Sequence, residues 1–160
     1  MTRSIIARRS PIHGTGVFAA RTLKAGTEVI EYRGRLITHA YADRHYGDGG
    51  ETGHTFLFTL NERYIIDANV DGSDARWINY SCDPNCQAVL HEDDKGRPKK
   101  DRVIIEALRD IKRGEELTYD YGITLEVRQT ARLKKIWECR CGSPQCIGTM
   151  LKPKSRVKKA

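Results

Sequence analysis

Three cysteines near the C-terminus constrain this chain more than any other feature. Cys139, Cys141 and Cys146 have the spacing C-x-C-x4-C. A structural zinc site is tetrahedral and takes four ligands, so this cluster lacks one ligand. The other cysteines are Cys82 and Cys86, far upstream in the segment Asn-Tyr-Ser-Cys-Asp-Pro-Asn-Cys. If a metal ion joins the two segments, the C-terminal stretch must fold back onto the middle of the chain.

The chain has 160 residues, a length that suits one domain with a modest core. No apolar run approaches the roughly 18 residues of a membrane span. The first ten residues lack the apolar stretch of a signal peptide. We therefore expect a protein that is made and used inside a cell, with no membrane partner. In such a reducing compartment, five cysteines with this crowding favour a metal ion over disulfides.

The net charge of +7 is confined to the end of the chain. Residues 134–160 contain eight Lys or Arg and one acidic residue, whereas residues 1–133 contain 20 basic and 20 acidic side chains. An isolated basic tail suits weak electrostatic contact with nucleic acid or another polyanion. A solvated terminus that aids solubility explains the same charges equally well, so composition leaves both interpretations open.

Short β-like runs dominate the chain. They occupy residues 29–32, 55–60, 64–67 and 103–108. A tight hairpin connection is expected at 61–63 and an exposed hairpin loop at 91–102, while only 38–46 and 124–136 favour helices. The sequence thus predicts a mainly β fold with few helices. It does not predict a βαβ nucleotide-binding domain, so Gly-Thr-Gly at 14–16 is no dinucleotide fingerprint.

Distinctive motifs follow one another in a fixed order. They are His-Gly-Thr-Gly-Val-Phe-Ala at 13–19 with Glu-Tyr-Arg-Gly at 31–34, Ala-Arg-Trp-Ile-Asn-Tyr-Ser-Cys-Asp-Pro-Asn-Cys at 75–86, Gly-Glu-Glu-Leu-Thr-Tyr-Asp-Tyr-Gly at 114–122, and the C-x-C-x4-C cluster. Together they resemble the SET-domain protein-lysine methyltransferases with a post-SET zinc motif, over about residues 4–150. The small size also resembles compact bacterial members of that family, some of which act on host chromatin.

The resemblance implies a SET-domain fold of small sheets around a C-terminal pseudoknot, followed by a small post-SET zinc module. The implied divisions are a SET domain at 1–122 with an insert at about 38–60, a helical connector at 123–136, the zinc module at 137–151 and a basic tail at 152–160. Such threading of the chain is rare. It would bring residues 79–82 next to residues 119–121, which no local pattern indicates.

The resemblance also implies the residues of an active site. Tyr121, Tyr32 and Tyr119 match tyrosines around the target lysine, with Tyr121 aimed at the transfer site and Tyr119 limiting the degree of methylation. S-adenosylmethionine would be bound by Gly14, Thr15, Gly16, Arg76, Trp77, Asn79 and Tyr80. The zinc ligands would be Cys82, Cys139, Cys141 and Cys146, with Cys86 as a spare buried thiol. Without the resemblance, a mid-strand tyrosine is more typical of a packed core.

Some positions depart from the family pattern. Tyr80 stands where histidine is usual, Thr15 stands where a bulky aromatic residue is common, and Phe56 stands near the position of another channel tyrosine. Tyr80 preserves main-chain contacts but lacks an imidazole, and Phe56 removes one hydroxyl. A non-catalytic module with this fold, binding peptide or cofactor, is therefore an alternative to an active enzyme.

The main hypothesis is a protein-lysine N-methyltransferase that uses S-adenosylmethionine, carries zinc and has a monomethyl bias. Its substrate would be a histone or a basic nucleoid protein, bound as an extended strand beside the insert. The protein would be cytoplasmic in a bacterium, and nuclear or chromatin-associated in a eukaryote or after delivery to a host. A basic zinc protein that binds nucleic acid is disfavoured, because residues 1–133 carry no net charge.

Overall fold

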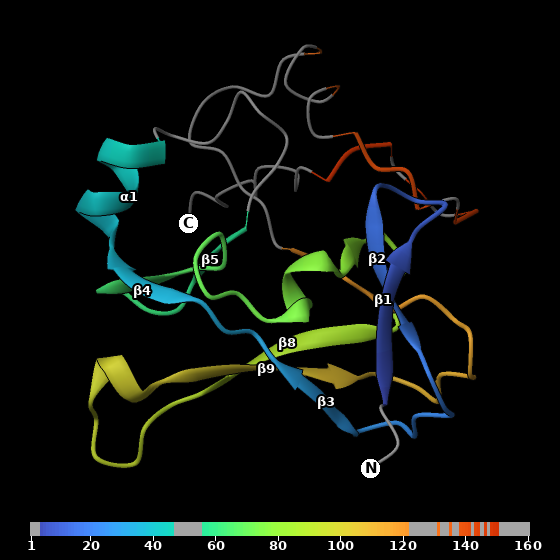
Figure 1. Ribbon diagram of the computed structural model, residues 1–160, viewed down its shortest axis with the longest axis horizontal. Helices are drawn as coiled ribbons and strands as arrows, with labels where there is room; N and C mark the ends of the chain where they lie inside the picture. Colours follow the sequence, from blue (N-terminus) through green and yellow to red (C-terminus); the bar gives the residue numbers. More distant parts are fainter. Residues whose placement is uncertain are drawn as a thin grey trace, which may run out of the picture.

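The computed structural model describes residues 4–46 and 56–121, together with Ala131, Lys135, 138–141, 143, 144, 146 and 148–150. The strands in these residues are β1 (Ile5–Arg9), β2 (Thr15–Ala19), β3 (Glu28–Glu31), β4 (Arg35–Thr38), β5 (Leu57–Thr59), β6 (Tyr64–Asp67), β7 (Asn79–Tyr80), β8 (Cys86–His91), β9 (Arg102–Ala107) and β10 (Thr118–Tyr119). Helix α1 (His39–Tyr46) follows β4, and the 3-10 helices η1 (Asp74–Trp77) and η2 (Pro98–Lys100) precede β7 and β9. The expected mainly β fold is confirmed (Figure 1).

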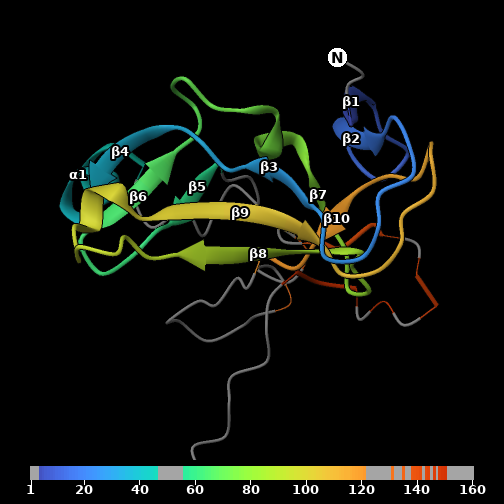
Figure 2. The same cartoon turned by 90° about the horizontal axis from the view of Figure 1, so that it is seen from below.

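The strands form small separate sheets. Three are antiparallel, with the strand orders β1–β2, β3–β9–β8 and β4–β6–β5. The fourth is a short parallel pair of β7 and β10. The β4–β6–β5 sheet and α1 lie at one end of the molecule and β1–β2 at the other, with β7 and β10 between them (Figure 2).

Most local predictions from the sequence match the structure. The runs 29–32, 64–67 and 103–108 correspond to β3, β6 and β9, whereas 55–60 yields only the three residues of β5. Helix α1 confirms the prediction for 38–46. The helix predicted at 124–136 lies outside the described residues, except that Ala131 and Lys135 are helical. No helix in the described part of the chain is long and apolar enough to cross a membrane.

The predicted connection between β5 and β6 has a clear local cause. The side-chain oxygen of Asn61 accepts hydrogen bonds from the backbone N–H groups of Arg63 at 3.0 Å and Tyr64 at 2.9 Å. Asparagine side chains favour turns because they can bond to the backbone two residues on. The turn therefore fixes the pairing of Thr59 with Ile65.

The core forms where β9 crosses the middle of the molecule. Val103, Ile105 and Ala107 on one face of β9 are at most 2% exposed, and Ile104 on the other face is also buried, at 7% exposed. Successive side chains of a strand point to opposite faces, so β9 is covered on both faces over residues 103–105. Val103, Ile105 and Ala107 pack with Val17, Leu23, Ile78, Ile111 and Leu117 from other elements. One continuous core thus holds the small sheets together.

The pairing of β7 with β10 places residues 79–80 beside residues 118–119, and the ring of Tyr80 contacts that of Tyr121, so the predicted approach of these two segments is confirmed for these residues. The buried side chain of Asn85 holds the second strand in place. Its Nδ2 donates to the carbonyl oxygen of Glu116 at 2.8 Å, and its Oδ1 accepts from the N–H of Thr118 at 2.9 Å. Because an amide carries both a donor and an acceptor, one side chain satisfies the carbonyl group of Glu116, just before β10, and the N–H group of Thr118 in β10.

A fully buried carboxylate, that of Asp67, joins α1 to the β4–β6–β5 sheet. It accepts hydrogen bonds from Tyr46 Oη at 2.8 Å, Arg35 Nη2 at 3.2 Å, and both the backbone N–H and the Nδ2 of Asn69 at 3.0 Å. Burial by itself raises the pKa of Asp67, but the hydrogen bonds from these donors outweigh it and lower the pKa. The carboxylate is therefore ionised and satisfied in the folded protein.

Replacing Asp67 by Asn is expected to lower the free energy of unfolding by about 2–3 kcal/mol at neutral pH, because hydrogen bonds to a charge are lost. The folded-state pKa lies below the unfolded value of about 3.9, so the carboxylate stabilises the fold above that pH. This stabilisation is lost as the pH falls through the folded pKa. Urea unfolding should show a difference between wild type and Asp67→Asn that narrows in acid.

The matched control is Asp43→Asn on the exposed side of α1, which should change the stability by less than about 0.5 kcal/mol. A difference for Asp67→Asn that widens in acid would contradict the role of its charge.

Candidate active site and metal centre

An aromatic cluster occupies the junction of β5, β7 and β10. Ring centroids are 5.5 Å apart between Tyr80 and Tyr121, and 4.8 Å apart between Tyr121 and Tyr119. The contacts continue from Tyr119 to Phe58 at 6.5 Å and from Phe58 to Tyr32 at 5.0 Å. The structure therefore brings the three tyrosines predicted as catalytic into one connected group.

The hydroxyl groups in this cluster have defined directions. Tyr121 donates to the carbonyl oxygen of Ile78, and Tyr32 donates to that of Phe56 at 3.1 Å. The hydroxyl of Tyr119 has no hydrogen-bond partner among the described residues. Burial raises the pKa of all three tyrosines, so they are neutral near pH 7. Because a hydroxyl has one proton, Tyr121 and Tyr32 can only accept a further hydrogen bond from a ligand.

The turn before β2 and the first residues of that strand, together 10–16 and called the glycine turn below, lie against β7. The Nδ2 of Asn79 donates to the carbonyl oxygen of His13 at 3.1 Å and lies 3.5 Å from that of Thr15. At Gly16, an added Cβ would lie 2.1 Å from Oε1 of Glu116, so any larger residue would displace the side chain of Glu116. The structure thus brings the predicted cofactor residues Gly14, Thr15, Gly16, Asn79 and Tyr80 to the same region of the fold.

Arg76 and Trp77 support this region from η1. The Arg76 guanidinium lies 4.6 Å from the centre of the Trp77 ring, and its Nη1 donates to Gly72 O at 2.6 Å. Trp77 packs edge-on against Phe56, with centroids 5.2 Å apart. Phe56 in turn accepts the hydrogen bond from Tyr32. The tryptophan therefore packs at the edge of the core and connects η1 to the aromatic cluster.

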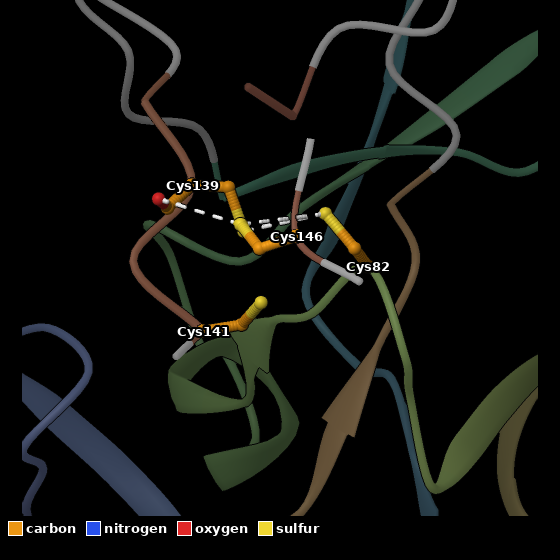
Figure 3. A group of neighbouring side chains, drawn as sticks. All are labelled: Cys82, Cys139, Cys141 and Cys146. Atoms are coloured by element: carbon orange, nitrogen blue, oxygen red, sulfur yellow. Dashed lines mark hydrogen bonds between the residues drawn. The ribbon is translucent and has the colours of Figure 1, made fainter. Parts of the chain in front are cut away.

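Thiols from two distant segments meet beside the end of β7. Cys82 lies there with Cys139, Cys141 and Cys146 from the C-terminal segment, and the four side chains point toward one another (Figure 3). All four sulfur atoms lie within 4.8 Å of one another, with Cys82 Sγ 3.6 Å from Cys139 Sγ and 3.9 Å from Cys146 Sγ. Zinc–sulfur bonds of about 2.3 Å in a tetrahedron place the sulfurs about 3.8 Å apart. The donor set therefore fits a four-coordinate metal ion.

The remaining cysteine has a different environment. Cys86 is 1% exposed, and burial raises the pKa of its thiol to about 12. It lies outside the group of four sulfur atoms formed by Cys82, Cys139, Cys141 and Cys146. A thiolate is the form that binds metal. Cys86 is thus a neutral thiol in the core, in agreement with its prediction as a spare buried thiol.

A family model described as the SET domain matches residues 14–122. The chain belongs to the SET-domain family. It is 41% identical over 143 residues to the H3 lysine-4 specific histone-lysine N-methyltransferase of Aspergillus oryzae, covering 88% of this chain and 11% of that protein. It is 38% identical over 149 residues to the protein of the same description from Saccharomyces cerevisiae, covering 91% of this chain and 13% of that protein.

Further relatives agree with this placement. Human histone-lysine N-methyltransferase 2D is 40% identical over 144 residues, covering 89% of this chain and 2% of that protein. The SET-domain chain thus spans only 2–13% of the length of these curated relatives. A solved humanized mutant of the Chaetomium thermophilum Polycomb Repressive Complex 2, bound to the inhibitor GSK126, matches 76% of this chain and 15% of its own. The TM-score is 0.62 at 33% identity.

Sequence reasoning did not identify several residues of this site. Phe58 completes the aromatic cluster, and Ser10 and Glu116 contact Asn79. Glu116 lies within the Gly-Glu-Glu-Leu-Thr-Tyr-Asp-Tyr-Gly motif, which could have drawn attention to it. Ser10 offers no such signal, because its partners are distant in sequence.

Proposed function

We propose that this SET-domain chain is a protein-lysine N-methyltransferase that uses S-adenosylmethionine. The observation that carries the proposal is the cluster of Tyr32, Tyr119 and Tyr121 beside Asn79 and the glycine turn. Family membership supports it, because the relatives described above are named histone-lysine N-methyltransferases. Tyr80 and Phe56 preserve aromatic packing at their positions, so the departures from the family pattern do not interrupt the cluster.

A lysine amine must be neutral to attack a methyl group, yet its ordinary pKa is about 10.4. Buried aromatic rings favour the uncharged amine by desolvation. Bound S-adenosylmethionine would supply an electrophilic methyl group on a sulfonium centre. The hydroxyl of Tyr121 already donates its hydrogen bond to the carbonyl oxygen of Ile78, so its oxygen would accept an N–H of the amine. This contact would turn the amine lone pair toward the methyl group, and such positioning contributes much of the rate.

The cofactor would lie on the surface formed by Gly14, Thr15, Gly16, Asn79 and Tyr80. Arg76 and Trp77 of η1 would support this surface. This assignment is supported by the contact of Asn79 with the glycine turn and by the stacking of Arg76 on Trp77. The missing side chains of the glycines allow close approach of a ligand to the backbone.

Zinc is the proposed metal for Cys82, Cys139, Cys141 and Cys146, because four thiols at these separations suit it. The ion would attach the C-terminal segment to Cys82, two residues after the end of β7. Since a site of this kind forms only in the folded chain, its binding energy would contribute to folding.

A histone is the proposed substrate, and chromatin the proposed location, because the relatives from fungi and human are named for histones. The peptide would add as an extended strand beside the 38–60 region, which ends in β5. The basic charges at 134–160 would assist weak contact with nucleic acid at the same location.

The first test is incubation of the purified, zinc-loaded chain with radiolabelled S-adenosylmethionine, histones and basic nucleoid proteins. Wild type should transfer label, and Tyr121→Phe should reduce the rate by about a hundredfold or more, because the amine loses its positioning acceptor. Binding of the cofactor without transfer to any protein would instead favour the non-catalytic binding module. Full activity of Tyr121→Phe would refute the role of that hydroxyl.

Tyr119→Phe is expected to shift the product from monomethyl toward di- and trimethyl-lysine. The hydroxyl of Tyr119 has no partner among the described residues and can bond to the amine, leaving less room for another methyl group. Mass spectrometry of the modified peptide measures the product ratio, and Tyr41→Phe on α1 is the matched control. Mainly trimethyl product from wild type, unchanged in Tyr119→Phe, would refute the monomethyl bias.

The metal is tested by zinc content after dialysis against a weak chelator. Wild type should retain stoichiometric zinc, whereas Cys82→Ser should lose most of it and unfold at a lower temperature, since a ligand is missing. Cys86→Ala is the control and should keep its zinc, because Cys86 lies outside the thiol cluster. Equal zinc retention by Cys82→Ser and wild type would disprove the site.

A further inference from the structure

We propose that Glu116 and Ser10 are positioning residues, which orient the side chain of Asn79 for binding of the cofactor. This inference rests on the proposed function, since it assumes that Asn79 contacts S-adenosylmethionine. It adds two residues that do not touch the reacting atoms but act through Asn79.

The three side chains form a closed triangle of hydrogen bonds. Oε1 of Glu116 accepts from Ser10 Oγ at 2.6 Å and from Asn79 Nδ2 at 2.8 Å. The third side joins Asn79 Nδ2 to Ser10 Oγ at 3.1 Å. Asn79 is 9% exposed, so little solvent competes for these contacts. Hydrogen bonds to a carboxylate are about twice as strong as those between neutral groups.

The triangle admits only one orientation of the Asn79 amide. Ser10 donates its single hydroxyl hydrogen bond to Glu116, so toward Asn79 its oxygen can act only as an acceptor. The carbonyl oxygens of His13 and Thr15 lie on the same side of Asn79. Reversing the amide would place Oδ1 against a carboxylate and carbonyl oxygens, which is repulsive. The amide nitrogen therefore faces the glycine turn.

The oxygen atom of the amide, Oδ1, is then available to a ligand. Oδ1 of Asn79 accepts no hydrogen bond from any residue in 4–46 or 56–121. It can accept one from an N–H or O–H group of a bound molecule. Without the triangle, only the carbonyl oxygens of His13 and Thr15 would oppose a rotation that presents the nitrogen to the same group. Glu116 and Ser10 thus strengthen the preference for the orientation in which Oδ1 of Asn79 meets the cofactor.

Both positioning residues are themselves held by the backbone. The N–H of Ser10 donates to Gly14 O at 2.7 Å, and the N–H of Ile12 donates to Ser10 Oγ at 2.9 Å. Glu116 forms a bridge with Phe18 of β2, and its carbonyl oxygen accepts from Asn85. Part of the preorganisation of the site therefore lies in these anchors, which lose little freedom when a ligand binds.

The test is a double-mutant cycle on the purified full chain, using Glu116→Gln, Ser10→Ala, Asn79→Ala and Glu116→Gln/Asn79→Ala. Calorimetry gives the Kd of S-adenosylmethionine, and kinetics separate KM from kcat. Glu116→Gln and Ser10→Ala should each raise Kd and KM about tenfold, with a smaller change in kcat. Because Glu116 acts through Asn79, the double variant should bind no more weakly than Asn79→Ala alone.

The matched control is Glu115→Gln, whose side chain forms a surface ion pair with Arg109 and should leave Kd unchanged. Thermal unfolding checks each variant. If Glu116→Gln fails to fold, Ser10→Ala, which lacks only a hydroxyl, carries the test in a cycle with Asn79→Ala. Unchanged Kd or fully additive losses overturn this inference while wild type still binds. No binding by wild type overturns the proposed function and this inference together.

Discussion

The parallel pairing of β7 with β10 is the contact on which the site depends. It consists of two residue pairs, Asn79 with Thr118 and Tyr80 with Tyr119. Strands this short have little stability of their own, so their neighbours must hold them. The side chain of Asn85 hydrogen-bonds to the backbone of Glu116 and Thr118, and the N–H of Leu117 donates to Val17 O at 2.7 Å. From this junction, Asn79 meets the glycine turn, Tyr121 meets the aromatic cluster, and Cys82 meets the thiols.

The electrostatics of the cluster follow from the same burial. The tyrosines stay protonated, and each described donor contact between Tyr32 or Tyr121 and the protein goes to a backbone carbonyl. Two nearby carboxylates have other partners, Asp67 with Arg35 and Tyr46, and Glu116 with Ser10 and Asn79. The aromatic surface beside them is therefore neutral. Such a surface disfavours a protonated amine without needing a base in contact with it.

Local patterns in the sequence predicted the strands that contain adjacent β-branched or aromatic residues, such as 64–67 and 103–108, because such residues favour extended backbone. They could not predict β7 or β10, which are too short to show any period. Adjacent glutamates illustrate the same limit. Glu115 pairs with Arg109 at the surface, whereas Glu116 turns inward to Asn79. Only contacts between distant segments distinguish the two, so no local pattern could identify Glu116 as a residue of the site.

The thiol cluster adds a constraint that the core does not supply. Among the described residues of the C-terminal segment, only Cys139 and Thr149 are buried, so this segment gains little from apolar packing. Cys82 follows Tyr80 by two positions, and the Tyr80 ring packs on Tyr121. A metal ion held by the four thiols, as proposed here, would therefore fix the backbone next to Tyr80, whose ring contacts the proposed catalytic Tyr121, as well as the C-terminal segment. Metal occupancy and the geometry of the aromatic cluster are then coupled through the few residues that follow β7.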